Sequence, residues 1–175
     1  MINWKPKIDY RVMGIDLAAL PKNPTGVCIM GDNIFLFTLY KDEEILTAIN
    51  EAKPRIVAID APLMKKIMVR EADIALKKYG AMPPTMPSMK MLVKRASKIV
   101  KEIDAEVIEV FPTATAKILG IYEKDWCKMA EKIGIKARNK HEIDAYLAAY
   151  TAYLYIQGKT EEVGGEEKVV VPKVF

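Results

Sequence analysis

Three aspartates and the only histidine of the chain are the residues whose placement could support chemistry. Asp16 and Asp60 each end a short apolar run, and Asp144 lies three residues after His141. Two ionised carboxylates held close together repel, so one takes up a proton unless a cation lies between them. Mg²⁺ prefers oxygen ligands and often binds one or two carboxylates together with water. The four residues therefore indicate a site for Mg²⁺ or Mn²⁺, provided that the fold brings them together.

The elements that would bring them together are predicted from the hydrophobic pattern. Residues 11–17 and 56–60 are near-continuous apolar runs, which is typical of strands buried on both faces of a parallel sheet. The carboxyl ends of parallel strands meet at one edge of the sheet, where open α/β folds place their sites. A long helix is predicted over residues 139–157, and it presents His141 and Asp144 on one face.

The rest of the chain adds a hairpin, a third core strand and shorter helices. The hairpin joins residues 27–30 to 34–40, and the third strand covers residues 106–111. Further helices are predicted over residues 42–49, 70–79, 88–102 and 113–119. This order predicts a single α/β domain over residues 1–175, a mixed sheet with helices on its faces. Its core spans about 11–157, and the tail, 158–175, could add a short edge strand over residues 168–172.

The composition excludes some classes of protein. With 51% hydrophobic and 29% charged residues, the chain is neither disordered nor membrane-embedded. No apolar stretch approaches the roughly 18 residues that a membrane span needs. The 27 basic residues against 23 acidic ones give a net charge of +4, too small an excess to mark a nucleic-acid-binding protein by bulk charge. The position of the charges therefore matters more than their sum.

The start of the chain and its cysteines predict a cytoplasmic protein. The first residues lack the apolar core of a signal peptide. Cys28 and Cys127 lie far apart without the spacing of metal ligands, which favours buried thiols in a reducing compartment. The scarcity of Asn and Gln beside abundant Lys and Glu fits a thermophilic source.

Basic residues on one predicted helix suggest a contact with phosphates. Lys90, Lys94 and Lys98 recur every four residues and form one stripe, which can bind phosphates or simply be a solvated helix face. No aromatic residue interrupts the stripe, which argues against a platform for stacking bases. Arg70 either pairs with Asp73 one helical turn later or reaches a phosphate.

Each of these features also has a purely structural interpretation. An Asp at a strand end commonly caps the turn that follows it. A His near the start of a helix often binds no metal ion. The loop over residues 80–89, rich in Met and Pro, could be a substrate-facing lid, a partner surface or an irregular crossover.

Five short motifs, in this order, resemble the domain-of-unknown-function 429 family, whose members are predicted nucleases with an RNase H-like fold. They are Gly14-Ile15-Asp16-Leu17-Ala18, Ala58-Ile59-Asp60-Ala61-Pro62-Leu63, Arg70-Glu71-Ala72-Asp73, Val107-Ile108-Glu109-Val110-Phe111-Pro112 and His141-Glu142-Ile143-Asp144-Ala145. The resemblance extends from Arg11 to about Pro172. The helix motif His-x-x-Asp-Ala is also similar to that of Holliday-junction resolvases in the same superfamily.

The resemblance implies a five-stranded mixed sheet with the hairpin at one edge. Asp16 on the first strand, Asp60 at the end of the fourth and Asp144 on the last helix would match the superfamily's metal-binding acids. His141 would match the additional helix ligand of some resolvases. Glu109, on the strand expected beside Asp60, could be a fourth metal-binding acid or a partner that supports the others.

The reaction that this resemblance implies is hydrolysis of DNA or RNA. Two Mg²⁺ or Mn²⁺ ions would clamp the scissile phosphate, with His141 completing a metal shell or assisting proton transfer. A homodimer like that of resolvases is left open. Two alternatives remain: a nucleotide-dependent phosphotransferase or phosphohydrolase of the actin-like superfamily, and a non-catalytic binding module. The chain has no second glycine-rich phosphate loop, which weighs against the first of these.

Overall fold

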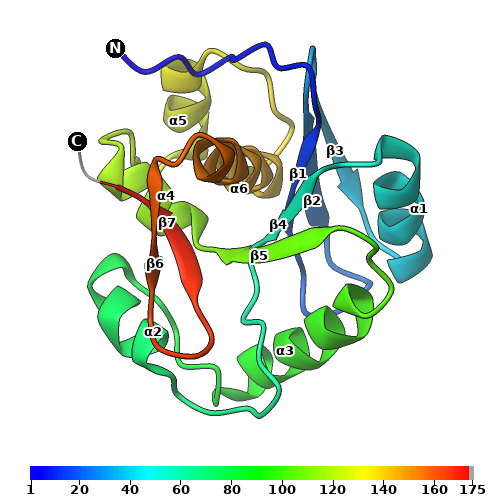
Figure 1. Ribbon diagram of the computed structural model, residues 1–175, viewed down its shortest axis with the longest axis vertical. Coiled ribbons are helices and arrows are strands. Elements are labelled where there is room, and N and C mark those ends of the chain that lie inside the picture. Colours follow the sequence, from blue (N-terminus) through cyan, green and yellow to red (C-terminus); the bar gives the residue numbers. More distant parts are fainter. Residues whose placement is uncertain (174–175) are drawn as a thin grey trace.

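The computed structural model describes residues 1–173, and all of its strands belong to one mixed sheet (Figure 1). Seven strands are ordered β3-β2-β1-β4-β5-β7-β6. Their bounds are β1 Val12–Asp16, β2 Thr25–Met30, β3 Ile34–Leu39, β4 Ile56–Ile59, β5 Glu106–Val110, β6 Thr160–Val163 and β7 Val169–Pro172. The central strands β1, β4, β5 and β7 run parallel, whereas the hairpins β2–β3 and β6–β7 supply antiparallel edges.

Helices cover both faces of this sheet, because its central strands are apolar on both sides. The helices are α1 Asp42–Ala52, α2 Glu71–Ala75, the 3₁₀ helix η1 Leu76–Tyr79, α3 Pro87–Val100, α4 Pro112–Ile118, α5 Trp126–Ile133 and α6 Lys140–Ile156. Alternate residues of β1 point to opposite layers. Val12 joins a core made with α4, α5 and α6, whereas Met13 joins one made with α1 and α3. In Figure 1, α6 lies on one side of β5 and α3 on the other.

The number of strands differs from the five expected. The tail supplies two strands, and β7 lies between β5 and β6 rather than at the sheet edge. Val169, Val170 and Val171 are all buried there, so this segment extends the core of the sheet. The positive φ of Gly158 and Gly164 lets the chain turn before β6 and before β7. The tail is therefore part of the sheet and not an appendage to it.

The helices follow the predicted pattern with local differences. The segment predicted as one helix over 70–79 divides into α2 and η1, and Arg70 precedes it in extended conformation. Helix α5, which the hydrophobic pattern did not single out, packs its buried face into the core beneath α6. Within residues 1–173, no helix combines the length and the apolar character that crossing a bilayer requires.

Candidate functional site

The two strand-terminal aspartates lie side by side at the carboxyl edge of the sheet. β1 and β4 are parallel neighbours in register, with Ile15 opposite Ile59. Asp16 is the last residue of β1, and Asp60 is the first residue after β4. The backbone N–H of Asp60 donates a hydrogen bond to the carbonyl of Ile15 at 2.8 Å. The predicted meeting of the two acids at one edge is thus what the strand pairing produces.

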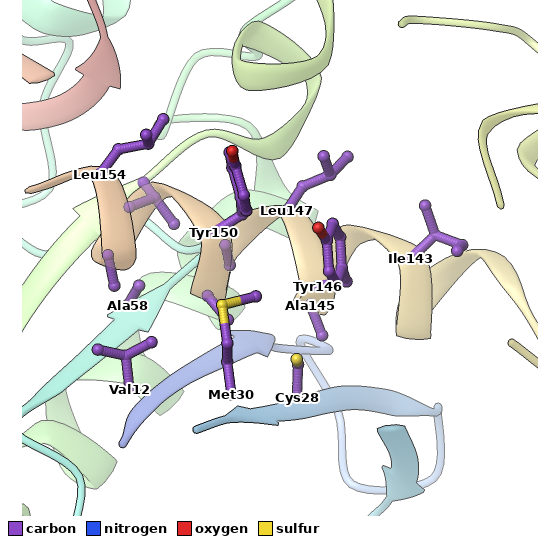
Figure 2. Close-up of a cluster of buried hydrophobic side chains, with 14 of the residues drawn as sticks. Val12, Cys28, Met30, Ala58, Ile143, Ala145, Tyr146, Leu147, Tyr150 and Leu154 are labelled. Carbon is purple, nitrogen blue, oxygen red and sulfur yellow. The ribbon is translucent and has the colours of Figure 1, made fainter. Parts of the chain in front are cut away.

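Two glycines let α6 lie directly on the strands that carry this edge. A Cβ atom at Gly14 would lie 2.1 Å from the carbonyl oxygen of Ala145. A Cβ atom at Gly26, which pairs with Asp16 across β1 and β2, would lie 1.9 Å from the carbonyl oxygen of His141. Figure 2 shows α6 over the strands below it, with Ala145 on the side that faces them. This close approach carries the first turns of α6 to the two aspartates.

A polar network fixes the start of α6 against β3. The side chain of Asn139 accepts a hydrogen bond from the N–H of Glu142 at 3.0 Å and caps the helix, as its position predicted. The buried carboxylate of Glu142 accepts hydrogen bonds from Thr38 Oγ1 at 2.7 Å and from the backbone N–H of Arg138 at 3.1 Å. Burial alone would raise the pKa of Glu142, but these bonds lower it. The network holds the helix start in one position.

At that position α6 brings an ammonium group and an imidazole to the aspartates. His141 Nδ1 lies 2.9 Å from Asp16 Oδ2, and Lys140 Nζ donates to Asp144 Oδ2 at 3.1 Å. The hydrogen bond with Asp16 raises the pKa of His141, and the Asp16 charge adds to the effect. The nearby charge of Asp144 raises the pKa of Lys140. Lys140 thus partly offsets the negative charge of the cluster, and His141 adds positive charge when it is protonated.

The carboxylates remain crowded in spite of these partners. Burial raises the pKa of Asp60 well above its ordinary value, and the charges of Asp16 and Asp144 and a hydrogen bond with Asp16 raise it further. Burial, followed by the charge of Asp16, raises the pKa of Asp144 to about 6. Such shifts are the response of carboxylates that share a site without enough positive charge.

The donor set suits a hard divalent cation, although the side chains are not arranged around one. Among residues 1–173, no three His, Cys, Asp or Glu side chains are grouped as a formed metal site. The Asp16 carboxylate faces His141 and the Asp144 carboxylate faces Lys140. Carboxylate oxygens are the ligands that Mg²⁺ and Mn²⁺ prefer, and a cation would relieve the repulsion that raises the pKa of Asp60.

Glu109 and Arg70 form a buried ion network beside this cluster. Arg70 donates from both terminal nitrogens to Glu109 at 2.8 Å, and from Nε and Nη2 to Asp73 at 3.0 Å. The backbone N–H of Leu63 also donates to Glu109 at 2.7 Å. Burial raises the pKa of Glu109 even though Arg70 and Leu63 act to lower it. The structure thus contains the pair with Asp73 that was one of the two roles predicted for Arg70, and it adds Glu109 as a second buried partner.

Replacing Arg70 by Met should cost about 3 kcal/mol or more of unfolding free energy, because two nearly buried carboxylates then lose their counterion. Urea unfolding measures this loss. The double variant Arg70→Met with Glu109→Gln should recover part of it. As a control, Lys132→Met removes an exposed pair with Glu123, which solvent screens, and should cost far less. If Arg70→Met and Lys132→Met lost equal amounts of unfolding free energy, the assigned role of Arg70 would be contradicted.

The lysines of α3 and the Met/Pro loop lie around the same edge. Lys90, Lys94 and Lys98 are exposed along α3, as the stripe predicted. Arg95 of the same helix points inward instead and donates to Asp42, Ala18 and Tyr40. A small hollow of about 80 Å³ is lined by Asp60 together with Met82 of the loop and Met89 of α3. The loop and the start of α3 are therefore neighbours of Asp60.

Sequence reasoning missed several residues of this arrangement. Lys140 could have been found, because it lies four residues before Asp144 on the same helix, the spacing of an ion pair. Thr38 and Gly26 gave no local signal, since their importance comes from contacts with a helix more than a hundred residues away.

The mixed sheet, with Asp16 and Asp60 at the carboxyl edge of its parallel strands, defines an RNase H-like α/β domain, and comparison with solved structures agrees. The chain superposes on Thermus thermophilus RuvC in complex with a Holliday junction substrate with a TM-score of 0.54 and 15% identity, covering 85% of this chain and 96% of that one. A second Thermus thermophilus RuvC structure gives a TM-score of 0.53 at 15% identity, with coverage of 85% and 96%. No family model and no curated protein sequence matches the chain. The structural likeness establishes the fold.

Proposed function

We propose that this protein is a divalent-metal-dependent nuclease that hydrolyses phosphodiester bonds of DNA or RNA. The observation that carries the proposal is geometric: Asp16 and Asp60 end two parallel strands that pair in register, and α6 reaches the same edge, where His141 Nδ1 lies 2.9 Å from Asp16 Oδ2. The RNase H-like fold and its likeness to a junction-bound RuvC support the same activity.

The three aspartates would hold Mg²⁺ or Mn²⁺, with His141 at the rim of the site. When bound, such ions stabilise charge on a scissile phosphate and lower the pKa of a bound water. The chain's own groups provide the rest. Gly14 and Gly26 set the distance between α6 and the sheet, Lys140 places positive charge beside Asp144, and His141 lies within hydrogen-bond distance of Asp16. His141 is partly exposed and can exchange a proton with a substrate oxygen.

The partner of this site would be a nucleic acid, contacted through its phosphates by Lys90, Lys94 and Lys98. Glu109 is assigned to support Asp60 from the neighbouring strand, where Ile59 pairs with Glu109. We place the activity in the cytoplasm. Of the two free cysteines, Cys28 is buried, as predicted, whereas Cys127 is exposed, so the expectation of a buried thiol was wrong there. A homodimer belongs to the proposal only for a branched substrate, in which two copies of the chain would each meet one of two equivalent strands.

The experiment that tests this function compares the wild type with Asp16→Asn and Asp144→Asn. Labelled single-stranded, duplex and four-way-junction DNA and the corresponding RNAs are incubated with Mn²⁺, and Mn²⁺ binding is measured by calorimetry in parallel. Each Asn keeps the shape of the side chain and removes its negative charge. We expect cleavage and metal binding by the wild type and loss of both in either variant.

Asp104→Asn is the matched control, because this aspartate is exposed and lies outside the cluster. It should behave as the wild type does. Cleavage that survives Asp16→Asn or Asp144→Asn would refute the assignment. A wild-type protein that binds nucleic acid yet takes up no Mn²⁺ would identify a non-catalytic binding module instead.

The lysine stripe predicts a particular dependence of binding on salt. The double variant Lys94→Gln with Lys98→Gln should weaken nucleic-acid binding and reduce the slope of log K against log salt by about 2, since each phosphate contact contributes about 0.9. Polarisation titrations at several salt concentrations measure the slope. Lys124→Gln with Lys128→Gln makes the same change of charge near α5 and should leave the slope unchanged. If both double variants gave equal slopes, Lys90, Lys94 and Lys98 would be a solvated helix face that does not bind phosphates.

A further inference from the structure

A large apolar groove lies at the opposite edge of the sheet from β6, between β3 and α1. It has a volume of about 690 Å³. Its floor is formed by side chains of β2 and β3, namely Ile29, Phe35, Phe37 and Leu39, and its wall by Ala48 and Ala52 of α1. Phe35, the second residue of β3, is 54% exposed, which is a large exposure for an aromatic side chain within a strand. The groove is therefore an apolar surface open to solvent.

This groove is a place where the helical layer is incomplete. On the other face of β3, Ile34 and Leu36 pack into the core beneath α6. On the groove face, Phe37 and Leu39 are only partly covered by the layer that contains α1 and α3. Within residues 1–173, Phe35 belongs to neither core. An apolar face of a sheet is ordinarily buried against another element.

The charge around the groove has the opposite sign to that of the whole chain. Glu43, Glu44 and Glu51 line it from α1, and all three are exposed. Glu43 and Glu51 lie eight residues apart, on the same side of the helix. Arg11 is the one basic residue in the lining, and its Nη1 donates to the carbonyl of Ala52. In a chain with a net charge of +4, this rim selects a basic occupant.

We propose that the groove binds an amphipathic helix of a partner protein, with aliphatic side chains on one face and Lys or Arg beside them. The aliphatic face covers Phe35 and Phe37, and the basic residues meet the glutamates of α1. A second copy of this chain is a poorer occupant. Symmetric contact through β3 would place the same acidic rim on both sides of the interface. The inference is independent of the proposed nuclease activity, because the groove lies at β3 and α1 rather than at the aspartates.

Fluorescence polarisation with two labelled model peptides tests the proposal on the full chain. Both are amphipathic helices of about 18 residues with Leu on one face. One carries Lys at the flanking positions and the other Glu. The groove variants are Phe35→Ser, and Glu43→Lys with Glu51→Lys. The matched control, Glu131→Lys with Glu166→Lys, makes the same change of net charge at exposed positions elsewhere.

We expect the Lys peptide to bind the wild type and the control alike, and the Glu peptide to bind at least about tenfold more weakly. Each groove variant should weaken binding of the Lys peptide by about tenfold or more. Absence of Lys-peptide binding to the wild type, or equal binding to the groove variants, would overturn the proposal. So would sedimentation velocity that shows a wild-type dimer converted to monomer by Phe35→Ser, since a second copy would then be the occupant.

Discussion

Replacing Asp60 by Asn is expected to remove Mn²⁺-dependent cleavage while making the metal-free protein more stable. The loss of activity should be about a thousandfold or more, because a bound metal contributes several kcal/mol of transition-state stabilisation. The gain in stability follows from the raised pKa of Asp60, which burial and the charges of Asp16 and Asp144 produce. An amide at this position has no charge to be repelled. Opposite signs for activity and stability are typical of a residue kept for function.

The dependence of stability on pH has the same origin. The folded-state pKa values of Asp60 and Asp144 lie above those of the unfolded chain, and that of Asp144 is about 6. The stability that these protonated groups contribute is therefore complete below about pH 4 and is lost as pH rises through the folded values. The raised pKa of His141 acts in the same direction. Urea unfolding in EDTA from about pH 4 to 8 should show wild-type stability falling with pH, and less steeply in Asp60→Asn.

A metal ion should reverse this trend in the wild type but not in Asp60→Asn. At neutral pH, Mn²⁺ should raise the melting temperature of the wild type and leave that of Asp60→Asn unchanged, because a ligand stabilises only the fold that binds it. Asp104→Asn, which changes an exposed carboxylate, should follow the wild type in every measurement. If Asp60→Asn were less stable than the wild type in EDTA, the Asp60 carboxylate would be a structural group and its place in a metal site would lose its basis.

Local patterns were sufficient to predict where these acids meet. Two apolar runs ending in Asp16 and Asp60 predict parallel strands, and parallel strands in register place their ends together. The cap at Asn139 fixes the start of α6, and the start of the helix fixes the face that carries His141. Each of these inferences depends on residues within one element or on a general rule of sheet topology.

The features that were missed depend on contacts between distant segments. The short strand over residues 168–172 was predicted at an edge of the sheet, but its place between β5 and β6 was not, because that depends on its pairing with β5. The pair of Arg70 with Asp73 was predicted, whereas its bonds to Glu109 on β5 were not, because they join residues 39 positions apart. The sequence near Arg70 and the sequence near Glu109 contain no pattern that predicts this contact. The same holds for the glycines of β1 and β2, which look like ordinary small residues of a strand.

Gly26→Ala should therefore be one of the most damaging conservative substitutions in the chain. Its Cβ would lie 1.9 Å from the carbonyl oxygen of His141 and 2.3 Å from the carbonyl carbon, so backbone must move. Overpacking of this kind costs about 1–3 kcal/mol. The displacement would also move His141 away from Asp16, to which it is now 2.9 Å. A shift of about 1 Å in a catalytic group can cost about a hundredfold in rate.

Gly31→Ala is the matched control for this substitution. Its Cβ would meet the flexible side chain of Arg11 at 3.1 Å and the carbonyl oxygen of Tyr10 at 3.3 Å, contacts that a small adjustment relieves. Urea unfolding and Mn²⁺ calorimetry on both variants separate a general loss of stability from a displaced site. Gly26→Ala should bind Mn²⁺ more weakly even under conditions where it is fully folded, whereas Gly31→Ala should bind as the wild type does. Unchanged metal binding in folded Gly26→Ala would mean that the position of α6 on β2 does not govern the site.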